Sequence, residues 1–357
     1  MPKMLEEVRD QPQALSRTLA GSIASAEKLR AHFSKRLPRL IVLVARGTSD
    51  NAAQFGRYLI EITTRIPVSL AAPSILTLYG SPVELNDVVV IGVSQSGEST
   101  DTNAVLEDAR RQGAITIGIT NDASSAMAGI VEFTLLIEAG AEISIAATKT
   151  YACQLLGLYL VAYALNGDID LEQLRNIPDW VHGVLRLEED IEALVERYFF
   201  MTRAVTVGRG LNYANALEFG LKLMETCYVV AERFSAADLM HGPIALVERA
   251  FPVFLFAPAG VTWPSMASVL DRLQELKAET LIITDSRNRE AHHKAARVIE
   301  IPAPPGPRTF GTSTAQEDLY TPIPYIVPAQ LFAGHLAALK GLNPDLPRTL
   351  NKITRTM

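Results

Sequence analysis

Cysteines are scarce in this sequence, and no long block of one charge occurs. Only two of the 357 residues are cysteines, Cys153 and Cys227, and both lie in apolar patterns typical of helices. Two such cysteines provide neither a disulfide framework nor the ligand spacing of a zinc site. The chain carries 33 basic and 39 acidic residues, a formal net charge of −6, without a basic cluster. This charge pattern argues against nucleic acid as a partner.

Long hydrophobic segments are also lacking. The most apolar stretch, YACQLLGLYLVAYAL at residues 151–165, is too short to span a bilayer comfortably, and polar residues close both its ends. It predicts a buried core helix. The N-terminal residues MPKMLEEVRDQPQ contain no apolar signal region. With 48% apolar and 20% charged residues, the composition indicates a soluble, cytoplasmic protein with room for two domains.

Short apolar runs rich in β-branched residues alternate with longer amphipathic stretches. Most runs are followed by Gly, Ser or Thr and then by a helical pattern, which is typical of parallel strands in βαβ units. The runs lie at residues 40–45, 87–93, 114–120, 133–139, 204–210, 251–259, 279–285 and 297–302. The sequence therefore predicts an α/β fold with doubly wound parallel sheets.

The two halves of the chain resemble each other. Three pairs of short segments match at an offset of 163 or 164 residues (209 − 46 and 269 − 105). The pairs are 46–47 with 209–210, 105–107 with 269–271, and 119–120 with 283–284. We expect two copies of one αβα unit, at residues 25–166 and 198–340. A helical, acidic linker at 167–197 joins them, and a tail at 341–357 follows.

The polar segment VSQSGESTDT, residues 93–102, follows the apolar run DVVVIG. Gly97 allows the backbone to turn there without a Cβ clash. A helix predicted over 101–111 begins directly afterwards, so its unpaired N–H groups face the same space. The side-chain hydrogen-bond donors of this loop include Ser94, Gln95, Ser96 and Ser99. Clustered donors at a helix start predict an anion site, with phosphate as the usual occupant.

Other readings of this loop are weaker. It contains neither the GxxxxGK[ST] nor the GxGxxG pattern, which disfavours nucleotides. A nucleophile elbow needs GxSxG, and Ser96 stands where the second glycine belongs. A plain connecting loop is the remaining alternative. In the second copy the equivalent residues 258–264 read PAGVTWP and keep only the hydroxyl of Thr262, which indicates that one copy alone carries a ligand loop.

A second strand end has a similar character. The segment ARGTSDN, residues 45–51, follows an apolar run and opens a predicted helix, with Thr48 and Ser49 as donors. By itself GTS is more typical of an ordinary helix N-cap. Because ligands of doubly wound sheets bind at the carboxyl ends of strands, GTS and SQSGEST together favour one shared ligand.

Six motifs together resemble the double sugar-isomerase (SIS) domain. This family includes the isomerase half of glutamine–fructose-6-phosphate aminotransferase, stand-alone glucosamine-6-phosphate deaminases and fructosamine-6-phosphate deglycases. The motifs are GTS (47–49), SQSGEST (94–100), EISIAATKT (142–150), LEFGLKLMETCY (217–228), DLMHGP (238–243) and PRTLNK (347–352). The resemblance covers residues 25–357 and implies two tandem SIS domains, each an αβα sandwich.

The resemblance also implies roles for individual residues. Catalytic roles fall to Glu225 as the proton-shuttling carboxylate, Lys222 as the lysine that can engage the sugar carbonyl, His241 for ring opening, and Lys352 in a tail that closes over the sugar. Phosphate contacts fall to Thr48, Ser49, Ser94, Gln95, Ser96 and Ser99, while Glu142 and Ile145 line the pocket. It further implies a homodimer in which His241 reaches the neighbouring subunit's site, and no metal or redox cofactor.

Several of these residues have a plainer interpretation. Lys222 and Glu225 are three apart on a predicted helix and could form a surface ion pair. His241 precedes Gly242-Pro243, which we expect to start a helix over IALVERA, and there it could be a loop residue. Ile145 could be core packing. The tail could be a frayed terminus.

The reaction expected from the resemblance is conversion of glucosamine 6-phosphate to fructose 6-phosphate and ammonia. The aminotransferase needs a glutaminase domain with a cysteine directly after the initiator methionine, whereas this chain starts MPKML. Alternatives are a fructosamine-6-phosphate deglycase, another sugar-phosphate isomerase, or an isomerase half using external ammonia. A sugar-phosphate-sensing regulator is more remote, because no basic recognition helix precedes the first strand. Arg46 and Met240 depart from the cysteine and lysine common in aminotransferases, which leaves the exact sugar open.

Overall fold

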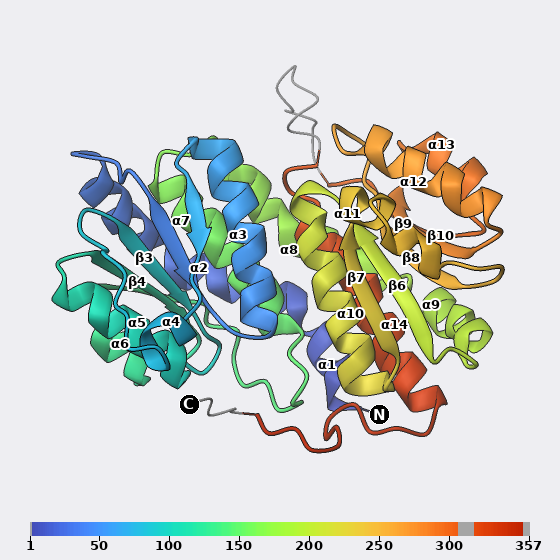
Figure 1. Ribbon diagram of the computed structural model, residues 1–357, viewed down its shortest axis with the longest axis horizontal. Helices are drawn as coiled ribbons and strands as arrows, with labels where there is room; N and C mark the ends of the chain where they lie inside the picture. Colours follow the sequence, from blue (N-terminus) through green and yellow to red (C-terminus); the bar gives the residue numbers. More distant parts are fainter. Residues whose placement is uncertain (1, 306–317, 353–357) are drawn as a thin grey trace. The chain divides into compact units, whose positions relative to one another are not determined.

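Two parallel five-stranded sheets form the framework of the computed structural model, which describes residues 2–305 and 318–352 (Figure 1). The chain divides into two compact units, each built around one sheet. Unit 1 comprises residues 1–12, 143–148 and 176–348, and unit 2 comprises 13–142, 149–175 and 349–357.

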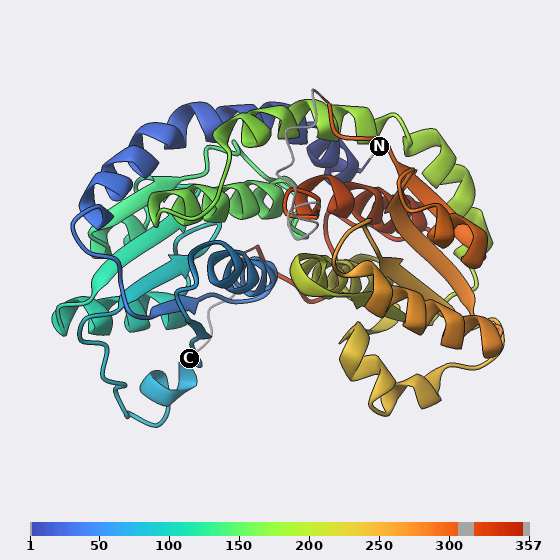
Figure 2. The same cartoon turned by 90° about the horizontal axis from the view of Figure 1, so that it is seen from above.

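The sheet of unit 2 has the strand order β2-β1-β3-β4-β5. Its strands are β1 (Ile41–Val44), β2 (Val68–Leu70), β3 (Val89–Val93), β4 (Ile115–Thr120) and β5 (Phe133–Leu136). Its helices are α2 (Gln11–Phe33), α3 (Thr48–Thr64), α4 (Ser74–Thr77), α5 (Thr100–Arg111), α6 (Ala126–Ile130) and α7 (Lys149–Ala164). The first residues of α2 belong to unit 1, and helices cover both faces of the sheet (Figure 2).

Unit 2 has a core on each face of its sheet. On one face, Val90 of β3 packs with Leu106 of α5 and Met127 of α6. On the other, α3 lies so close to α7 that a Cβ on Gly56 would stand 2.9 Å from Leu158. The central strand β3 is buried along its whole length, as strands covered by helices on both faces must be.

The sheet of unit 1 has the order β10-β9-β8-β6-β7, which is the same order traced along the chain. Its strands are β6 (Arg203–Gly208), β7 (Val230–Ser235), β8 (Pro252–Phe256), β9 (Glu279–Asp285) and β10 (Arg297–Ile301). The helices are α1 (Lys3–Arg9), α8 (Leu171–Leu185), α9 (Glu188–Val195), η1 (Glu196–Tyr198), η2 (Gly210–Asn212), α10 (Tyr213–Cys227), α11 (Ala236–Met240), η3 (Pro243–Leu246), α12 (Trp263–Glu275), α13 (Arg289–Lys294) and α14 (Pro322–Leu339), with α8 contributing residues to both units.

Aromatic rings fill the core of unit 1 between its sheet and helices α10 and α14. Phe254 of β8 contacts Phe219 and Phe332 with ring centroids 5.1 and 5.2 Å apart, in edge-on geometry. Tyr198 completes the cluster at 5.4 Å from Phe254. Such ring pairs add to the stabilisation that burial of their area already provides.

The predicted α/β repeat is confirmed. Both sheets follow one strand order, and each of the eight predicted apolar runs contains or overlaps a strand. The run at 151–165 is helix α7, which is almost entirely buried. The linker predicted at 167–197 contains α8 and α9. Of the predicted tail, residues 341–348 belong to unit 1 and 349–352 to unit 2, while 353–357 lie outside the described residues.

Three local features differ from the sequence expectation. Strands β2 and β7 were not predicted, because both are edge strands with exposed positions among their residues and lack a continuous apolar run. The prediction of a helix over IALVERA is wrong. Only the short 3₁₀-helix η3 forms, and Val247 leaves the helical conformation with a ψ of 119°.

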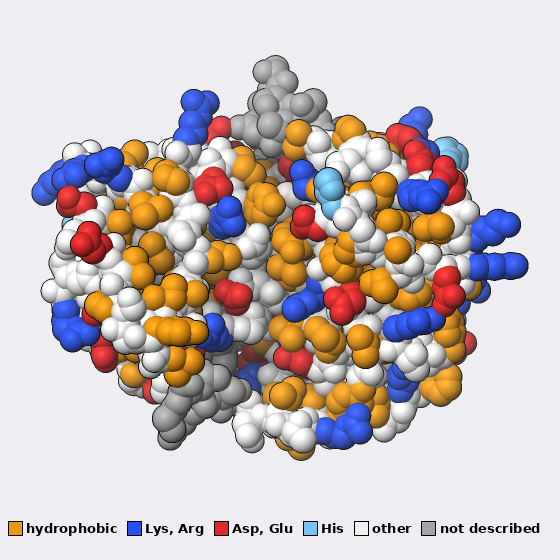
Figure 3. All heavy atoms as spheres, viewed as in Figure 1, with side chains coloured by type: hydrophobic (Ala, Val, Ile, Leu, Met, Phe, Trp, Pro, Cys, Tyr) orange, Lys and Arg blue, Asp and Glu red, His pale blue; other side chains and the backbone are white. Residues whose placement is uncertain are grey.

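The described surface is mixed in character. Charged side chains of both signs mingle with apolar ones on the described part of the face drawn in Figure 3, without one extended patch of Lys and Arg. Within residues 2–305 and 318–352, every helix is too short or too polar to cross a membrane.

The aromatic core yields a matched pair of variants. Phe254→Ala is expected to lower the free energy of unfolding by about 3–5 kcal/mol, because it removes a buried ring and leaves a cavity. Phe199→Ala, in the same unit but 56% exposed, is expected to change it by less than about 0.5 kcal/mol. Urea denaturation followed by circular dichroism measures both, and equal losses would contradict this assignment of the core.

Candidate functional site

The hydroxyl-rich loop after β3 is held in a defined shape by its own side chains. Gly97 has a φ of +67°, and its N–H donates to Ser94 Oγ at 3.1 Å. The carbonyl of Gly97 accepts from Asn103 Nδ2 at 3.0 Å. The N–H of Glu98 donates to Ser96 Oγ at 3.2 Å. The loop is therefore preorganised, and a preorganised donor set binds a ligand at less entropic cost.

The same loop leads directly into helix α5. Ser99 is the N-cap residue, but no side chain caps the helix there. Ser99 Oγ instead accepts from Thr102 Oγ1 at 3.0 Å. The positive end of a helix dipole without a capping side chain is a favourable place for an anion.

The GTS loop lies on the neighbouring strand end. Because Val44 of β1 pairs with Gly92 of β3, both loops leave the same edge of the sheet. Gly47 has a φ of +58°, and Thr48 opens helix α3 half-buried. Ser49 is buried, and its Oγ accepts from Gln154 Nε2 at 2.9 Å.

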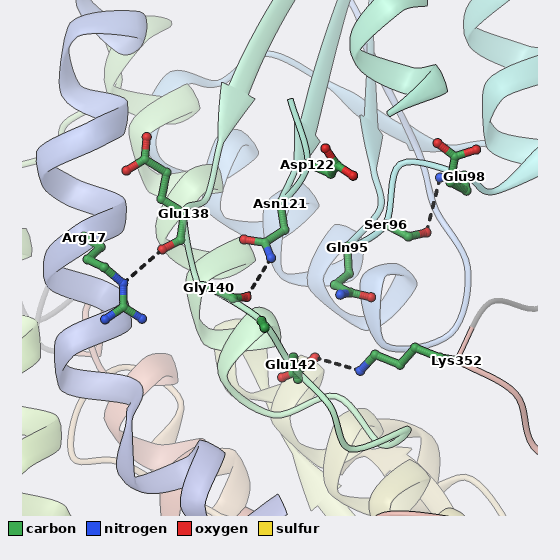
Figure 4. A pocket seen from close by; sticks show the side chains of 11 residues that line it. Arg17, Gln95, Ser96, Glu98, Asn121, Asp122, Glu138, Gly140, Glu142 and Lys352 are labelled. Carbon is green, nitrogen blue, oxygen red and sulfur yellow. Dashed lines mark hydrogen bonds and ion pairs between the residues drawn. The ribbon is translucent and has the colours of Figure 1, made fainter. Parts of the chain in front are cut away.

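A pocket of about 630 Å³ adjoins the hydroxyl-rich loop in unit 2 (Figure 4). Its lining residues are Arg17, Gln95, Ser96, Glu98, Asn121, Asp122, Glu138, Gly140, Ala141, Glu142 and Lys352. The structure thus brings four predicted site residues, Gln95, Ser96, Glu142 and Lys352, to one pocket. Lys352 Nζ lies 3.3 Å from Glu142 Oε2, which also accepts from Thr150 Oγ1 at 2.6 Å.

Ile145 does not line this pocket. It lies in the segment 143–148 that belongs to unit 1, half-buried, and its N–H donates to the carbonyl of Asp345 at 3.1 Å. The neighbouring Ser144 is held by backbone contacts to the carboxylate of Glu7 at 3.3 Å. These contacts hold the backbone around Ile145 within unit 1.

Lys222 forms a buried charged cluster on helix α10 of unit 1. Its Nζ lies 2.5 Å from Glu225 Oε2 and 3.3 Å from Glu218 Oε1. The side chains of Lys222 and Glu218 are almost completely inaccessible to solvent, whereas that of Glu225 is 23% exposed. This is not the surface ion pair that spacing alone would allow, because a surface pair would leave both partners in water.

Burial by itself lowers the pKa of Lys222, since it disfavours the charged form. The carboxylates of Glu218 and Glu225 outweigh that effect and raise the pKa above its ordinary value. Lys222 is therefore an ammonium ion near neutral pH. A fixed ammonium can stabilise negative charge that develops on a nearby oxygen.

His241 ends helix α11 on the surface of unit 1. Its N–H donates to the carbonyls of Ala237 and Asp238, at 3.2 Å each, and the side chain is exposed. The following Gly242 has a φ of +145°, so the chain turns sharply there. Exposure leaves the imidazole available to a ligand or to another chain.

Several residues of these clusters were not predicted. Glu218 could have been found, because it stands four residues before Lys222 on the same helical face. Asn121 and Asp122 could also have been found, since they follow β4 at the strand-end edge. Arg17, on α2, had no sequence signal. Within residues 2–305 and 318–352, no three His, Cys, Asp or Glu side chains gather as metal ligands.

Comparison with known proteins shows which family this chain resembles along its length. The SIS domain model matches residues 38–164 and 201–340. The glutamine–fructose-6-phosphate aminotransferase of Pyrococcus horikoshii is 37% identical over 98% of this chain, and the chain spans 57% of that protein's length.

Solved structures agree with that match. The C-terminal domain of glucosamine-fructose-6-phosphate aminotransferase from Francisella tularensis is 28% identical, with a TM-score of 0.85 over 97% of this chain and 98% of that one. Glucosamine-6-phosphate deaminase from Thermotoga maritima shares the fold at 20% identity, with a TM-score of 0.74 over 99% and 100% of the two chains.

The shape of the hydroxyl-rich loop can be tested at Gly97. A Cβ there would lie 2.3 Å from Ser125 Oγ in a left-handed backbone. Gly97→Ala is expected to cost about 1–2 kcal/mol of conformational strain and about 1–3 kcal/mol of steric overlap, and to weaken binding of inorganic phosphate.

Gly80→Ala is the matched control, because Gly80 has a φ of +59° but nothing within 4 Å of the added Cβ. It should show the strain alone and leave phosphate binding unchanged. Urea denaturation and isothermal titration calorimetry measure the two effects. A Gly97 variant that matches the Gly80 variant in both would contradict the described loop.

Proposed function

The chain belongs to the SIS domain family, and from that membership we propose that it is a sugar-phosphate isomerase that deaminates glucosamine 6-phosphate. The products are fructose 6-phosphate and ammonia. The observation that carries most weight is the buried Lys222 between two carboxylates. Burying charged groups costs folding stability, and such clusters concentrate at functional sites. The glutamine-dependent reaction is the one named for relatives such as the Pyrococcus horikoshii protein, and this chain spans only 57% of that protein's length.

The hydroxyl-rich loop holds the phosphate in this proposal. Ser94, Ser96 and Ser99 supply hydroxyls and Gln95 an amide, at the uncapped start of α5. Thr48 and Ser49 contribute from the neighbouring strand end. Phosphate binding here anchors the substrate without taking part in bond breaking, and its binding energy positions the reacting carbons.

Glu225 is the base that moves a proton between C2 and C1 of the open-chain sugar. It takes the C2 proton of the amino aldose, which gives an enolamine, and returns a proton to C1. The ammonium of Lys222 stabilises the negative charge that develops on the C1 oxygen. Water then adds to C2 of the resulting imine. The C2–N bond breaks, ammonia is released, and a ketone remains at C2.

His241 opens the sugar ring, and we propose that it does so for the site of a second copy of the chain. A protonated imidazole can donate a proton to the ring oxygen as a general acid. Its exposure at the end of α11 supports a role towards a partner. Lys352, paired with Glu142 beside Gln95 and Ser96, closes the sugar pocket from the C-terminal tail.

The proposed base is tested with Glu225→Gln. Glucosamine 6-phosphate should release ammonia and fructose 6-phosphate with the wild type, and kcat should fall by at least about 100-fold in the variant, because general-base catalysis contributes that much. Glu248→Gln, an exposed glutamate paired with Arg203 in the same unit, should keep full activity. Coupled assays for both products measure this.

Full turnover by the Glu225 variant would overturn its assignment as the base. If the wild type releases no ammonia from any hexosamine phosphate, the deaminase proposal fails. Release of an amine from a fructosamine 6-phosphate would then favour a deglycase.

The raised pKa of Lys222 makes a separate prediction. Only a neutral amine condenses with a carbonyl, and a lysine with a raised pKa stays protonated up to and beyond its ordinary value of about 10.4. Borohydride added during turnover near neutral pH is therefore expected to leave Lys222 unmodified. Peptide mass spectrometry checks this, and a reduced sugar adduct on Lys222 would show that it acts as a Schiff-base amine.

A further inference from the structure

An ion pair joins the two loops that leave β1 and β3 in unit 2. Arg46 directly precedes the GTS loop, and Asp101 is the second residue of α5, just after the hydroxyl-rich loop. The guanidinium of Arg46 contacts Asp101 Oδ2 through Nη2 at 2.7 Å and through Nε at 3.2 Å. The side chain of Asp101 is only 6% exposed and that of Arg46 is 46% exposed.

The negative charge of Asp101 lies at the helix start where a phosphate would bind. A carboxylate in the first turn of a helix interacts favourably with the positive end of the helix dipole. That is the feature a phosphate would use at the start of α5. The segment 93–102 also contains Glu98 and neither Lys nor Arg. A phosphate bound there shares its loop and helix start with two acidic residues, and the loop itself offers no compensating cation.

Arg46 removes one of these conflicts. Its positive charge neutralises Asp101, and two hydrogen bonds to one carboxylate oxygen hold that side chain in place. Arg46 Nη1 has no hydrogen-bond partner among the described residues. Because the pair spans neighbouring strand ends, it also links the start of α5 to the GTS loop.

The repeat provides an independent comparison. Arg46 has the counterpart Arg209 in the second copy, where the hydroxyl-rich loop is replaced by PAGVTWP. At the offset of 164, Asp101 corresponds to Ser265. Arg209 makes no ion pair among the residues that the structure describes. The arginine thus occurs in both copies, but the aspartate occurs only where the hydroxyl-rich loop occurs.

We propose that Arg46 is a positioning residue for the phosphate end of the substrate, acting by neutralising and holding Asp101. The inference rests on the phosphate role proposed for the loop, and it does not depend on which sugar is converted. It predicts that Arg46 affects binding of any phosphate, including inorganic phosphate, and leaves the proton transfers at C1 and C2 unaffected.

A double-mutant cycle with Arg46→Ala and Asp101→Asn tests the proposal. Arg46→Ala removes the positive charge beside the buried carboxylate of Asp101 and is expected to weaken inorganic phosphate binding and raise KM by about tenfold or more, with kcat within about twofold. Arg46→Ala/Asp101→Asn is expected to recover phosphate affinity to within about threefold of the wild type, since the repulsive charge is gone. Isothermal titration calorimetry with inorganic phosphate and steady-state kinetics provide the readouts.

Arg111→Ala is the matched control. Arg111 pairs with Asp108 at 2.9 Å near the far end of the same helix, where its side chain is 75% exposed. Because the arginine of this pair is exposed and lies away from the start of α5, its loss should leave phosphate binding and KM unchanged. Thermal unfolding of all variants identifies any general loss of stability. Such a loss would lower kcat and weaken phosphate binding together.

Three results would overturn the proposal. They are no phosphate binding by the wild type, unchanged affinity in Arg46→Ala, and a double variant as weak as the single one. Failure of the proposed function is distinguishable from these. A wild type that releases no ammonia but shows the expected pattern of phosphate affinities removes the deaminase assignment and leaves the role of Arg46 intact.

Discussion

Parallel strand pairing is the constraint on which the rest of this structure depends. Consecutive parallel strands require a crossover helix, so each strand end lies beside the start of a helix. In unit 2 this places the ends of β1 and β3 side by side, because Val44 pairs with Gly92. Donor-rich loops at those two ends therefore share one edge of the sheet, and each leads into a helix whose positive end faces the same region.

The two units carry different polar side chains on this common framework. Unit 2 has several hydroxyl side chains at the β3 strand end, whereas the equivalent loop of unit 1 keeps only that of Thr262. In unit 1, helix α10 occupies the position that α3 has in unit 2, and it carries Lys222 between Glu218 and Glu225. A lysine so completely buried stays charged only because two carboxylates accompany it. The two units thus keep one strand order while their loops and helices carry different side chains.

Much of this was predictable because the strong signals are local. Eight apolar runs marked strands, since strands buried on both faces need continuous apolar sequence. The GTS and SQSGEST loops were recognisable as donor clusters, and Lys222 and Glu225 as neighbours on one helical face. Edge strands β2 and β7 escaped prediction because they are only half-buried. The expected helix after Pro243 did not form beyond one 3₁₀ turn, because Val247 adopts an extended conformation.

The sequence by itself determined the α/β class, the internal repeat, and the clustering of hydrogen-bond donors in the two loops. These follow from composition and periodicity, which act over a few residues at a time. Only the tertiary structure decided that Lys222 is buried with Glu218, that Lys352 pairs with Glu142, and that Arg46 holds Asp101. Burial and charge pairing between distant positions depend on which elements pack together. That packing is a property of the whole fold, and it sets the electrostatics on which the proposed chemistry relies.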